Sequence, residues 1–297
     1  MLGVTEDAAS LSLAFRRIGI LGSGIMGAGI AEVAARAGFE VVLRSREHAT
    51  AVGTVAALDK NLARQVERGR LTEDERQAIV ARVTPTGALD DLAGCDLVIE
   101  SVVEDLATKQ ALLADIDRVC PPTTIFATNT STLPVIDLAM HTSRPDRVCG
   151  IHFFNPAPMM SLVELVRPLS ASDETMAAAR AFTEACGKQA VEVTDRAGFI
   201  VNALLFPYLN NAVRLWEHGT ASLEDIDAAM KGGCNFPMGP FALLDLVGLD
   251  TSVAILDALY AELRDPHVAA VPTLRRMVAA GRLGRKSGRG FYLYPSR

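Results

Sequence analysis

The sequence predicts an α/β protein: a doubly wound, mainly parallel β-sheet with a helical hairpin inserted into it, followed by an all-α C-terminal domain. Three observations predict this fold. A strand, a glycine-rich turn, a helix and a second strand follow one another over residues 17–43. Strand and helix patterns then alternate as far as residue 193, which is typical of a parallel sheet. From residue 197 onward almost every pattern is helical, so we place the domains at 1–196 and 197–297.

The glycine-rich turn between the first strand and the first helix predicts a dinucleotide site of the Rossmann type. Gly22 allows a tight turn, Gly24 lets the backbone approach a pyrophosphate, and Gly27 lets the helix pack closely on the strand. Free N–H groups at the helix N-terminus attract the phosphates. A glycine turn that binds no ligand is the alternative. The expected contacts in this turn are Gly22, Gly24, Ile25, Met26 and Gly27.

The other elements follow from apolar periodicity and capping signals. Apolar residues at helical spacing over 51–66, and the capping-box pattern that begins at Thr72, predict a helical hairpin. Ser222 and Asp250 are the expected N-caps of two C-terminal helices. Strands are expected at 17–21, 40–43, 96–102, 124–127, 149–153, 163–166, 190–193 and 291–293. Helices are expected at 28–37, 105–119, 173–186, 200–217, 223–231, 240–247, 251–263 and 272–280.

Composition and charge exclude several classes of protein. The formal net charge is −6, whereas a general nucleic-acid binder is normally basic. No apolar run reaches the roughly 18 residues of a membrane span, and residues 1–15 contain no Lys or Arg, so neither a membrane protein nor a signal peptide is expected. The five scattered cysteines suit reduced thiols in a cytoplasm. The five dispersed histidines lack zinc-ligand spacing, so we expect no metal.

The end of the second strand predicts which nicotinamide dinucleotide binds. NAD-selective sites carry an Asp or Glu there, which bonds to the ribose hydroxyls. This chain has Arg44, Ser45 and Arg46 instead. Because a guanidinium pairs with a phosphate through two hydrogen bonds, the arginines favour the 2′-phosphate of NADP(H). The alternative is that both arginines are solvated loop residues and that Glu47 supports NAD(H) binding.

Four phrases behind the glycine turn point to a known family. They are Thr128-Asn129-Thr130-Ser131, Gly150-Ile151-His152-Phe153-Phe154-Asn155-Pro156, Leu162-Val163-Glu164 and Gly198-Phe199-Ile200-Val201-Asn202. In this order, the chain from about residue 17 to 294 resembles the short-chain L-3-hydroxyacyl-CoA dehydrogenases. The resemblance implies hydride transfer between a nicotinamide cofactor and C3 of a short-chain 3-hydroxyacyl-CoA or 3-ketoacyl-CoA, such as 3-hydroxybutyryl-CoA and acetoacetyl-CoA. It also implies a homodimer formed by the helical domain.

The resemblance assigns the catalytic residues, and elementary chemistry supports the assignment. Oxidation of a secondary alcohol needs a base, and imidazole titrates near neutral pH. His152 ends an expected strand, where α/β sites form, and Glu164 can orient its ring. The family places a Ser and an Asn on the reacting oxygen, which implies these roles for Ser131 and Asn202. The structural alternatives are a buried pair of Glu164 with Arg167 and an Asn202 that satisfies backbone groups.

Family contacts extend to further cofactor and coenzyme A residues. Cofactor contacts map onto Glu104, Lys109, Asn155 and Lys286, for which solvated surface lysines are the plain alternative. On the hairpin, Lys60, Arg64 and Arg68 recur every four residues and share one helix face. The family contacts coenzyme A from this hairpin, which implies substrate contacts for Lys60, Asn61 and Arg68; Asn61 and Arg68 stand where the family has a hydroxyl and a lysine. A solvated face is the alternative.

Local charge supports polyanionic ligands despite the acidic total. Residues 44–70 contain six basic and three acidic side chains, so this window is positive while the chain as a whole is negative. We expect the ligands in a cleft between the two domains. Two other readings stay open. One is a related dehydrogenase of an acyl-carrier-protein-bound or free hydroxy acid, and the other is a non-catalytic cofactor-binding protein, as among the lens crystallins of this superfamily.

Overall fold

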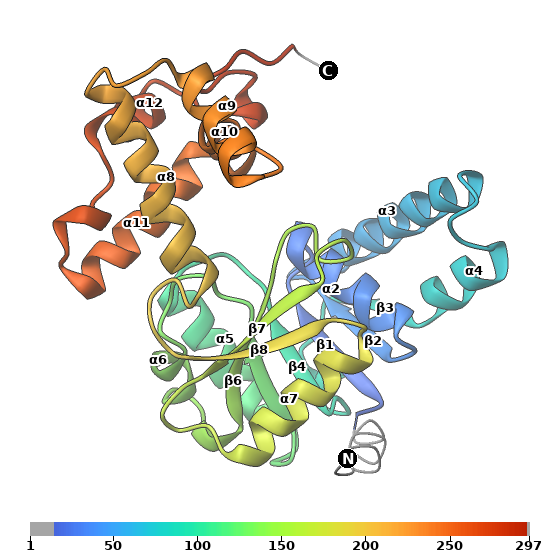
Figure 1. Ribbon diagram of the computed structural model, residues 1–297. Helices are drawn as coiled ribbons and strands as arrows, with labels where there is room; N and C mark the ends of the chain where they lie inside the picture. Colours follow the sequence, from blue (N-terminus) through green and yellow to red (C-terminus); the bar gives the residue numbers. More distant parts are fainter. Residues whose placement is uncertain (1–14, 296–297) are drawn as a thin grey trace, which may run out of the picture. The chain divides into compact units, whose positions relative to one another are not determined.

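The computed structural model describes residues 15–295 of the chain (Figure 1). The absence of a signal peptide is predicted from residues 1–15, and residues 1–14 lie outside the described range. The chain divides into two compact units between Asp195 and Arg196. No helix in the described part is long and apolar enough to cross a membrane.

The first unit is built on one eight-stranded sheet, and this confirms the predicted fold class. Its strand order is β3-β2-β1-β4-β5-β6-β7-β8. All neighbouring strands are parallel except β6 and β7, which are antiparallel. Because the order reverses between β1 and β4, a ligand crevice is expected at the carboxyl ends of these strands. The strands are β1 (Arg17–Leu21), β2 (Glu40–Arg44), β3 (Val83–Thr86), β4 (Leu97–Glu100), β5 (Ile125–Thr128), β6 (Val148–Phe153), β7 (Leu162–Arg167) and β8 (Gln189–Thr194).

Helices pack on the sheet, and α3 and α4 form the inserted hairpin (Figure 1). Helices α2 and α7 share one apolar core with the sheet, in which Ile30 and Phe182 are fully buried. At the start of α4, the Thr72 side chain and Glu75 form the predicted capping box. The helices of this unit are α2 (Ile25–Arg36), α3 (His48–Glu67), α4 (Glu73–Ala81), α5 (Leu106–Val119), α6 (Val135–Ala139) and α7 (Asp173–Ala185), with 3₁₀ turns η1 (Asp90–Leu92) and η2 (Pro145–Arg147).

Two elements of this unit are absent from the prediction. Strand β3 contains Pro85, which argues against a strand inside a sheet. In the structure β3 is an edge strand with a neighbour on one side only. The N–H that Pro85 lacks is therefore not needed by a second neighbouring strand. Helix α6 has five residues, too few for a helical period to be recognised in the sequence.

The second unit is helical. Its core gathers Phe206, Phe241 and Leu256 from different helices, and Ser222 caps α9 as predicted. Its helices are α8 (Val201–Glu217), α9 (Leu223–Cys234), α10 (Pro240–Val247), α11 (Leu249–Leu263) and α12 (Pro272–Ala279), with 3₁₀ turns η3 (Pro266–Val268) and η4 (Arg285–Ser287).

Two predictions for the second unit are wrong. Asp250 does not cap α11, because the helix begins at Leu249, two residues earlier than predicted, and its N-cap is Gly248, whose φ of 103° suits glycine. No strand forms at 291–293. The N–H groups of Phe291 and Tyr292 instead donate to the buried Asp245 carboxylate at 2.9 Å each, so an acidic side chain replaces a neighbouring strand.

Candidate active site

The glycine turn has the geometry that a dinucleotide requires. Gly22 has a φ of 109°, and a Cβ there would lie 2.4 Å from the carbonyl oxygen of Ser101. A Cβ at Gly27 would lie 1.9 Å from the Gly22 carbonyl oxygen, so both positions need glycine. At Gly24 a Cβ would meet nothing within 4 Å, which leaves open space beside the backbone. A pyrophosphate fits this arrangement.

The N-terminus of α2 offers donors to such a ligand. Gly24 is the N-cap, and no side chain caps the helix. Ile25 is 79% exposed and Met26 is half-buried, so no bulky side chain closes over the first turn. Uncapped N–H groups and the positive end of the helix dipole together suit a phosphate.

Two arginines stand at the end of β2. Arg44 is half-buried and its Nε donates to the Gly87 carbonyl oxygen at 3.3 Å, while Arg46 is exposed. Burial and then the charge of Arg46 lower the pKa of Arg44. Neither arginine makes an ion pair with another residue in the range 15–295. An anion bound here would therefore meet two guanidinium groups that are not held in ion pairs.

Three of the four predicted catalytic residues lie together at the ends of β5, β6 and β7. His152 on β6 pairs directly with Glu164 on the antiparallel β7, so both side chains are on the same face of the sheet. His152 Nδ1 lies 2.7 Å from Glu164 Oε2, and His152 Nε2 lies 3.2 Å from Ser131 Oγ. His152 is 4% exposed and Glu164 is fully buried. The alternative pair of Glu164 with Arg167 is wrong, because Arg167 pairs with Asp173 and Glu192.

This geometry defines the proton positions that the imidazole can use. An ionised Glu164 only accepts hydrogen bonds, so Nδ1 carries the hydrogen and Nε2 faces Ser131 as an acceptor. A proton taken up at Nε2 would create an imidazolium that the buried carboxylate stabilises. The three side chains can therefore move a proton to or from a group bound beside Ser131.

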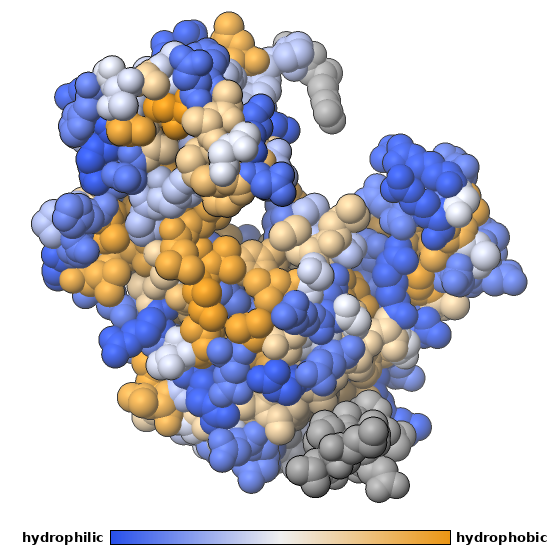
Figure 2. Space-filling view, viewed as in Figure 1, coloured by the Kyte–Doolittle hydropathy of each residue, from blue (hydrophilic) through white to orange (hydrophobic). Residues whose placement is uncertain are grey.

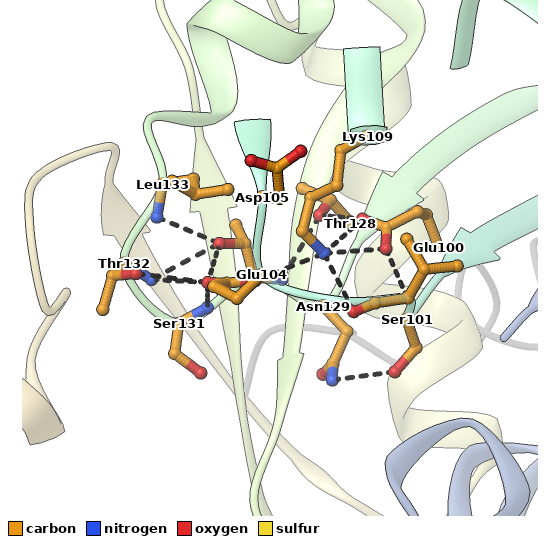
Figure 3. Close-up of polar contacts among 12 residues, drawn as sticks. Glu100, Ser101, Glu104, Asp105, Lys109, Thr128, Asn129, Ser131, Thr132 and Leu133 are labelled. Carbon is orange, nitrogen blue, oxygen red and sulfur yellow. Dashed lines mark hydrogen bonds and ion pairs between the residues drawn. The ribbon is translucent and has the colours of Figure 1, made fainter. Parts of the chain in front are cut away.

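Glu104 and Lys109 belong to a polar network at the ends of β4 and β5, which Figure 3 shows. Lys109 Nζ lies 2.7 and 2.9 Å from the two carboxylate oxygens of Glu100 and 3.3 Å from Glu104 Oε2. Lys109 is 1% exposed, so the alternative of a solvated surface lysine is wrong for this residue.

Asn129 is a residue of the site to which the sequence assigned no role. Its Oδ1 accepts from the N–H of Phe153 at 2.8 Å, and its Nδ2 donates to Ser101 Oγ at 3.4 Å. It thereby ties the residue after His152 to the segment that packs against Gly22. The available signal is its position, directly after the carboxyl end of β5.

The remaining predicted residues lie elsewhere. Asn155 is exposed after β6. On the hairpin, Lys60 and Asn61 in α3 and Arg68, the residue that follows α3, are exposed, and Figure 2 shows hydrophilic residues over the far end of the hairpin. Asn202, 8% exposed at the start of α8, and Lys286, which pairs with Asp250 at 2.6 Å, belong to the second unit.

Among residues 15–295, no group of three or more His, Cys, Asp or Glu side chains could hold a metal ion.

Comparison with known proteins covers both units. The model of the 3-hydroxyacyl-CoA dehydrogenase NAD binding domain matches residues 17–196, and that of the C-terminal domain of the same family matches 198–294. A 3-hydroxybutyryl-CoA dehydrogenase of Mycobacterium tuberculosis (strain H37Rv) is 47% identical over 96% of this chain and all of its own length. A probable 3-hydroxybutyryl-CoA dehydrogenase of Bacillus subtilis is 44% identical over 95% of this chain and 98% of its own length. The crystal structure of the (S)-3-hydroxybutyryl-CoA dehydrogenase of Ralstonia eutropha superposes with a TM-score of 0.92, at 43% identity, over 95% of this chain and all of that one.

Proposed function

Because the chain belongs to the 3-hydroxyacyl-CoA dehydrogenase family, a family of nicotinamide-dependent oxidoreductases, we propose that it interconverts 3-hydroxybutyryl-CoA and acetoacetyl-CoA. The observation that carries this proposal is the row Ser131, His152 and Glu164, in which the His152 ring lies within hydrogen-bond distance of both other side chains. The names of the M. tuberculosis, B. subtilis and R. eutropha relatives support the short acyl chain.

In the oxidative direction, His152 Nε2 takes the proton of the C3 hydroxyl, and the hydride leaves C3. The bound nicotinamide supplies the acceptor for that hydride. Ser131 donates a hydrogen bond to the reacting oxygen, and Glu164 stabilises the imidazolium that forms. In the reductive direction, His152 returns the proton to the oxygen of the 3-keto group. Asn202, the first-turn residue of α8, is proposed as a second donor to the reacting oxygen.

We assign the dinucleotide to the turn and strand ends of the first unit. Backbone at Gly22, Gly24, Ile25, Met26 and Gly27 would hold the pyrophosphate. Arg44, Ser45 and Arg46 would hold the 2′-phosphate of NADP(H), and the absence of an ion pair at either arginine within the described chain supports this choice. Glu104, Lys109, Asn155 and Lys286 stay proposed contacts of the same cofactor.

The proposed cofactor preference is tested with acetoacetyl-CoA as substrate. We expect a kcat/KM about tenfold higher with NADPH than with NADH, and the Arg44→Asp variant should reverse this order, since a carboxylate repels a phosphate and bonds to ribose hydroxyls. Arg16, exposed just before the amino end of β1, whereas Arg44 stands at the carboxyl end of the parallel β2, provides the control variant Arg16→Asp, which should keep the wild-type order. Equal efficiencies with both dinucleotides would contradict the preference.

The same assay tests the reaction itself. Steady-state reduction is compared for acetoacetyl-CoA, the matching acyl-carrier-protein thioester and free acetoacetate. Turnover of the coenzyme A thioester with the highest kcat/KM is the expected result. A clear preference for the carrier-protein thioester or the free acid would establish the related-dehydrogenase alternative, and no turnover of any substrate would favour a non-catalytic protein.

Coenzyme A is proposed to lie on the hairpin beside Lys60 and Asn61 in α3 and Arg68 just after its end, all exposed. We expect Lys60→Glu and Arg68→Glu each to raise the KM for acetoacetyl-CoA about tenfold, because each reversal places a negative charge beside a polyanion. The KM for NADPH should stay within about twofold. Arg16→Glu serves as the charge-matched control. An equal rise in both KM values would remove coenzyme A from this part of the hairpin.

Oligomeric state and location complete the proposal. Helix α8 presents Leu204, which is 71% exposed, and Leu215, which is 43% exposed, and we assign this apolar surface to a homodimer interface. The five cysteines are all free thiols, which suits a cytoplasmic location.

A further inference from the structure

The carboxylate of Glu104 closes the turn that carries Ser131. Its Oε1 accepts hydrogen bonds from the N–H groups of Ser131 at 2.9 Å and Thr132 at 3.2 Å. The hydroxyl of Thr130 also donates to Oε1, and that of Thr132 does so at 3.2 Å. In Figure 3 these contacts converge on one side of Glu104, while Lys109 lies on the other. One oxygen of Glu104 thus holds three consecutive residues of the turn.

The buried Lys109 holds the second oxygen of Glu104. Lys109 reaches from α5 to Glu104 Oε2 at 3.3 Å and to both oxygens of Glu100. Glu100 is itself immobilised by the hydroxyl of Thr128 at 2.8 Å and by the N–H of Val102. The ammonium group is therefore committed to protein partners on both sides, and Glu104 is anchored to the sheet through it.

The contacts of Glu104 with Thr130, Ser131, Thr132 and Lys109 form a clamp. Neighbouring charge keeps the Glu104 carboxylate in this clamp ionised. Burial raises the pKa of Glu104, but the ammonium of Lys109 and the hydrogen bonds from Thr130 and Ser131 outweigh burial and hold the pKa below its usual range. At neutral pH the carboxylate therefore only accepts hydrogen bonds, which matches the four donors around Oε1.

The clamp bears on the proposed chemistry because Ser131 Oγ lies 3.2 Å from His152 Nε2. We propose that Glu104 is a positioning residue, which holds the turn Thr130–Thr132 so that the Ser131 hydroxyl faces His152, and that Lys109 anchors Glu104. This inference rests on the proposed function for its kinetic consequences only. It is distinct from a cofactor contact of Glu104, which would act on dinucleotide binding rather than on Ser131.

A kinetic double-mutant cycle tests the proposal. Glu104→Ala should lower kcat for acetoacetyl-CoA reduction by about 10- to 100-fold, since a displacement near 1 Å of a positioned group has effects of this size. A rise in the KM for NADPH would report the separate proposed cofactor contact of Glu104, whereas the fall in kcat reports the positioning of Ser131. In the Ser131→Ala background, Glu104→Ala should cause no further loss of kcat, because the residue it positions is already absent. Glu104→Gln keeps an acceptor oxygen and should recover part of kcat.

Asp105→Ala is the matched control. Asp105 is the neighbouring carboxylate, and it caps α5 through the N–H of Thr108 at 2.8 Å without a bond to the turn. Its loss should reduce stability and leave kcat near the wild-type value. Kinetic losses of Glu104→Ala that are equal in both Ser131 backgrounds, a rise in the KM for NADPH with unchanged kcat, or a kcat no lower than that of Asp105→Ala would each overturn the proposal.

Amide hydrogen exchange gives a readout that does not depend on turnover. In the free protein, Glu104→Ala should accelerate exchange at Ser131, whose N–H loses its acceptor, and at Thr132, whose N–H keeps only the longer contact to Thr130 Oγ1 at 3.4 Å, whereas Asp105→Ala should not. Unchanged exchange at these two amides would overturn the positioning role. If wild-type protein does not reduce acetoacetyl-CoA, the proposed function fails, and the exchange measurement alone decides the clamp.

Discussion

Replacing His152 with alanine is expected to lower kcat for acetoacetyl-CoA reduction by about 10²- to 10⁴-fold, the usual contribution of a general acid–base residue. His152 Nε2 faces Ser131, and its Nδ1 is held by a fully buried Glu164, so no other described side chain can replace it in this row. NADPH binding should persist, because its proposed pyrophosphate and 2′-phosphate contacts come from the glycine turn and Arg44. The measurements are steady-state kinetics and the fluorescence of bound NADPH.

A surface histidine supplies the control for this variant. His141 is exposed and bonds through Nδ1 to the Asp137 carbonyl oxygen, so His141→Ala should keep wild-type kcat. Thermal unfolding of His152→Ala separates lost chemistry from lost folding, since a buried ring is removed. A folded, NADPH-binding His152→Ala protein with near wild-type kcat would remove His152 from the mechanism.

Replacing Lys109 with methionine is expected to lower the free energy of unfolding by about 3–5 kcal/mol, the usual cost of leaving a buried charge without its partner. Lys109 is 1% exposed and Glu100 is fully buried, and the ammonium bonds to both of its carboxylate oxygens. Methionine fills similar space but leaves two carboxylates facing each other. Denaturant unfolding at neutral pH measures the change.

Two further variants make this prediction specific. Lys231→Met, at an exposed position of α9, should change the free energy of unfolding by no more than about 0.5 kcal/mol. The double variant Glu100→Gln/Lys109→Met removes both buried charges and should recover at least about half of the loss. A Lys109→Met protein as stable as Lys231→Met would show that the buried pair contributes nothing to folding.

Local patterns determined much of this structure before any tertiary contact was considered. Gly22 in the turn and Gly27 at the start of α2 stand where a Cβ would collide with backbone, and their spacing between a strand pattern and a helix pattern predicted the strand-turn-helix unit. The capping box at Thr72 predicted the second arm of the hairpin, because both hydrogen-bond partners lie within one helical turn.

Predictions failed where a partner distant in sequence replaced a local one. The strand expected at 291–293 does not form, because Asp245 accepts the N–H groups that a strand would have offered to a neighbour. Asp250 lies within the first turn of α11, where it forms an ion pair with Lys286, and it does not cap the helix. Strand β3 was not predicted because it contains Pro85. Only the strand order shows that β3 lies at the edge of the sheet, where proline is tolerated.

The sequence by itself determined the glycine turn, the hairpin, the fold class and the residue types of the row Ser131, His152 and Glu164. Only the tertiary structure decided which of those residues meet. The antiparallel register of β6 and β7 sets His152 opposite Glu164, and the packing of α5 on the sheet buries Lys109 between Glu100 and Glu104. The reason is physical: a turn or cap depends on neighbours in the chain, whereas strand register and helix packing bring together groups that local propensity cannot relate.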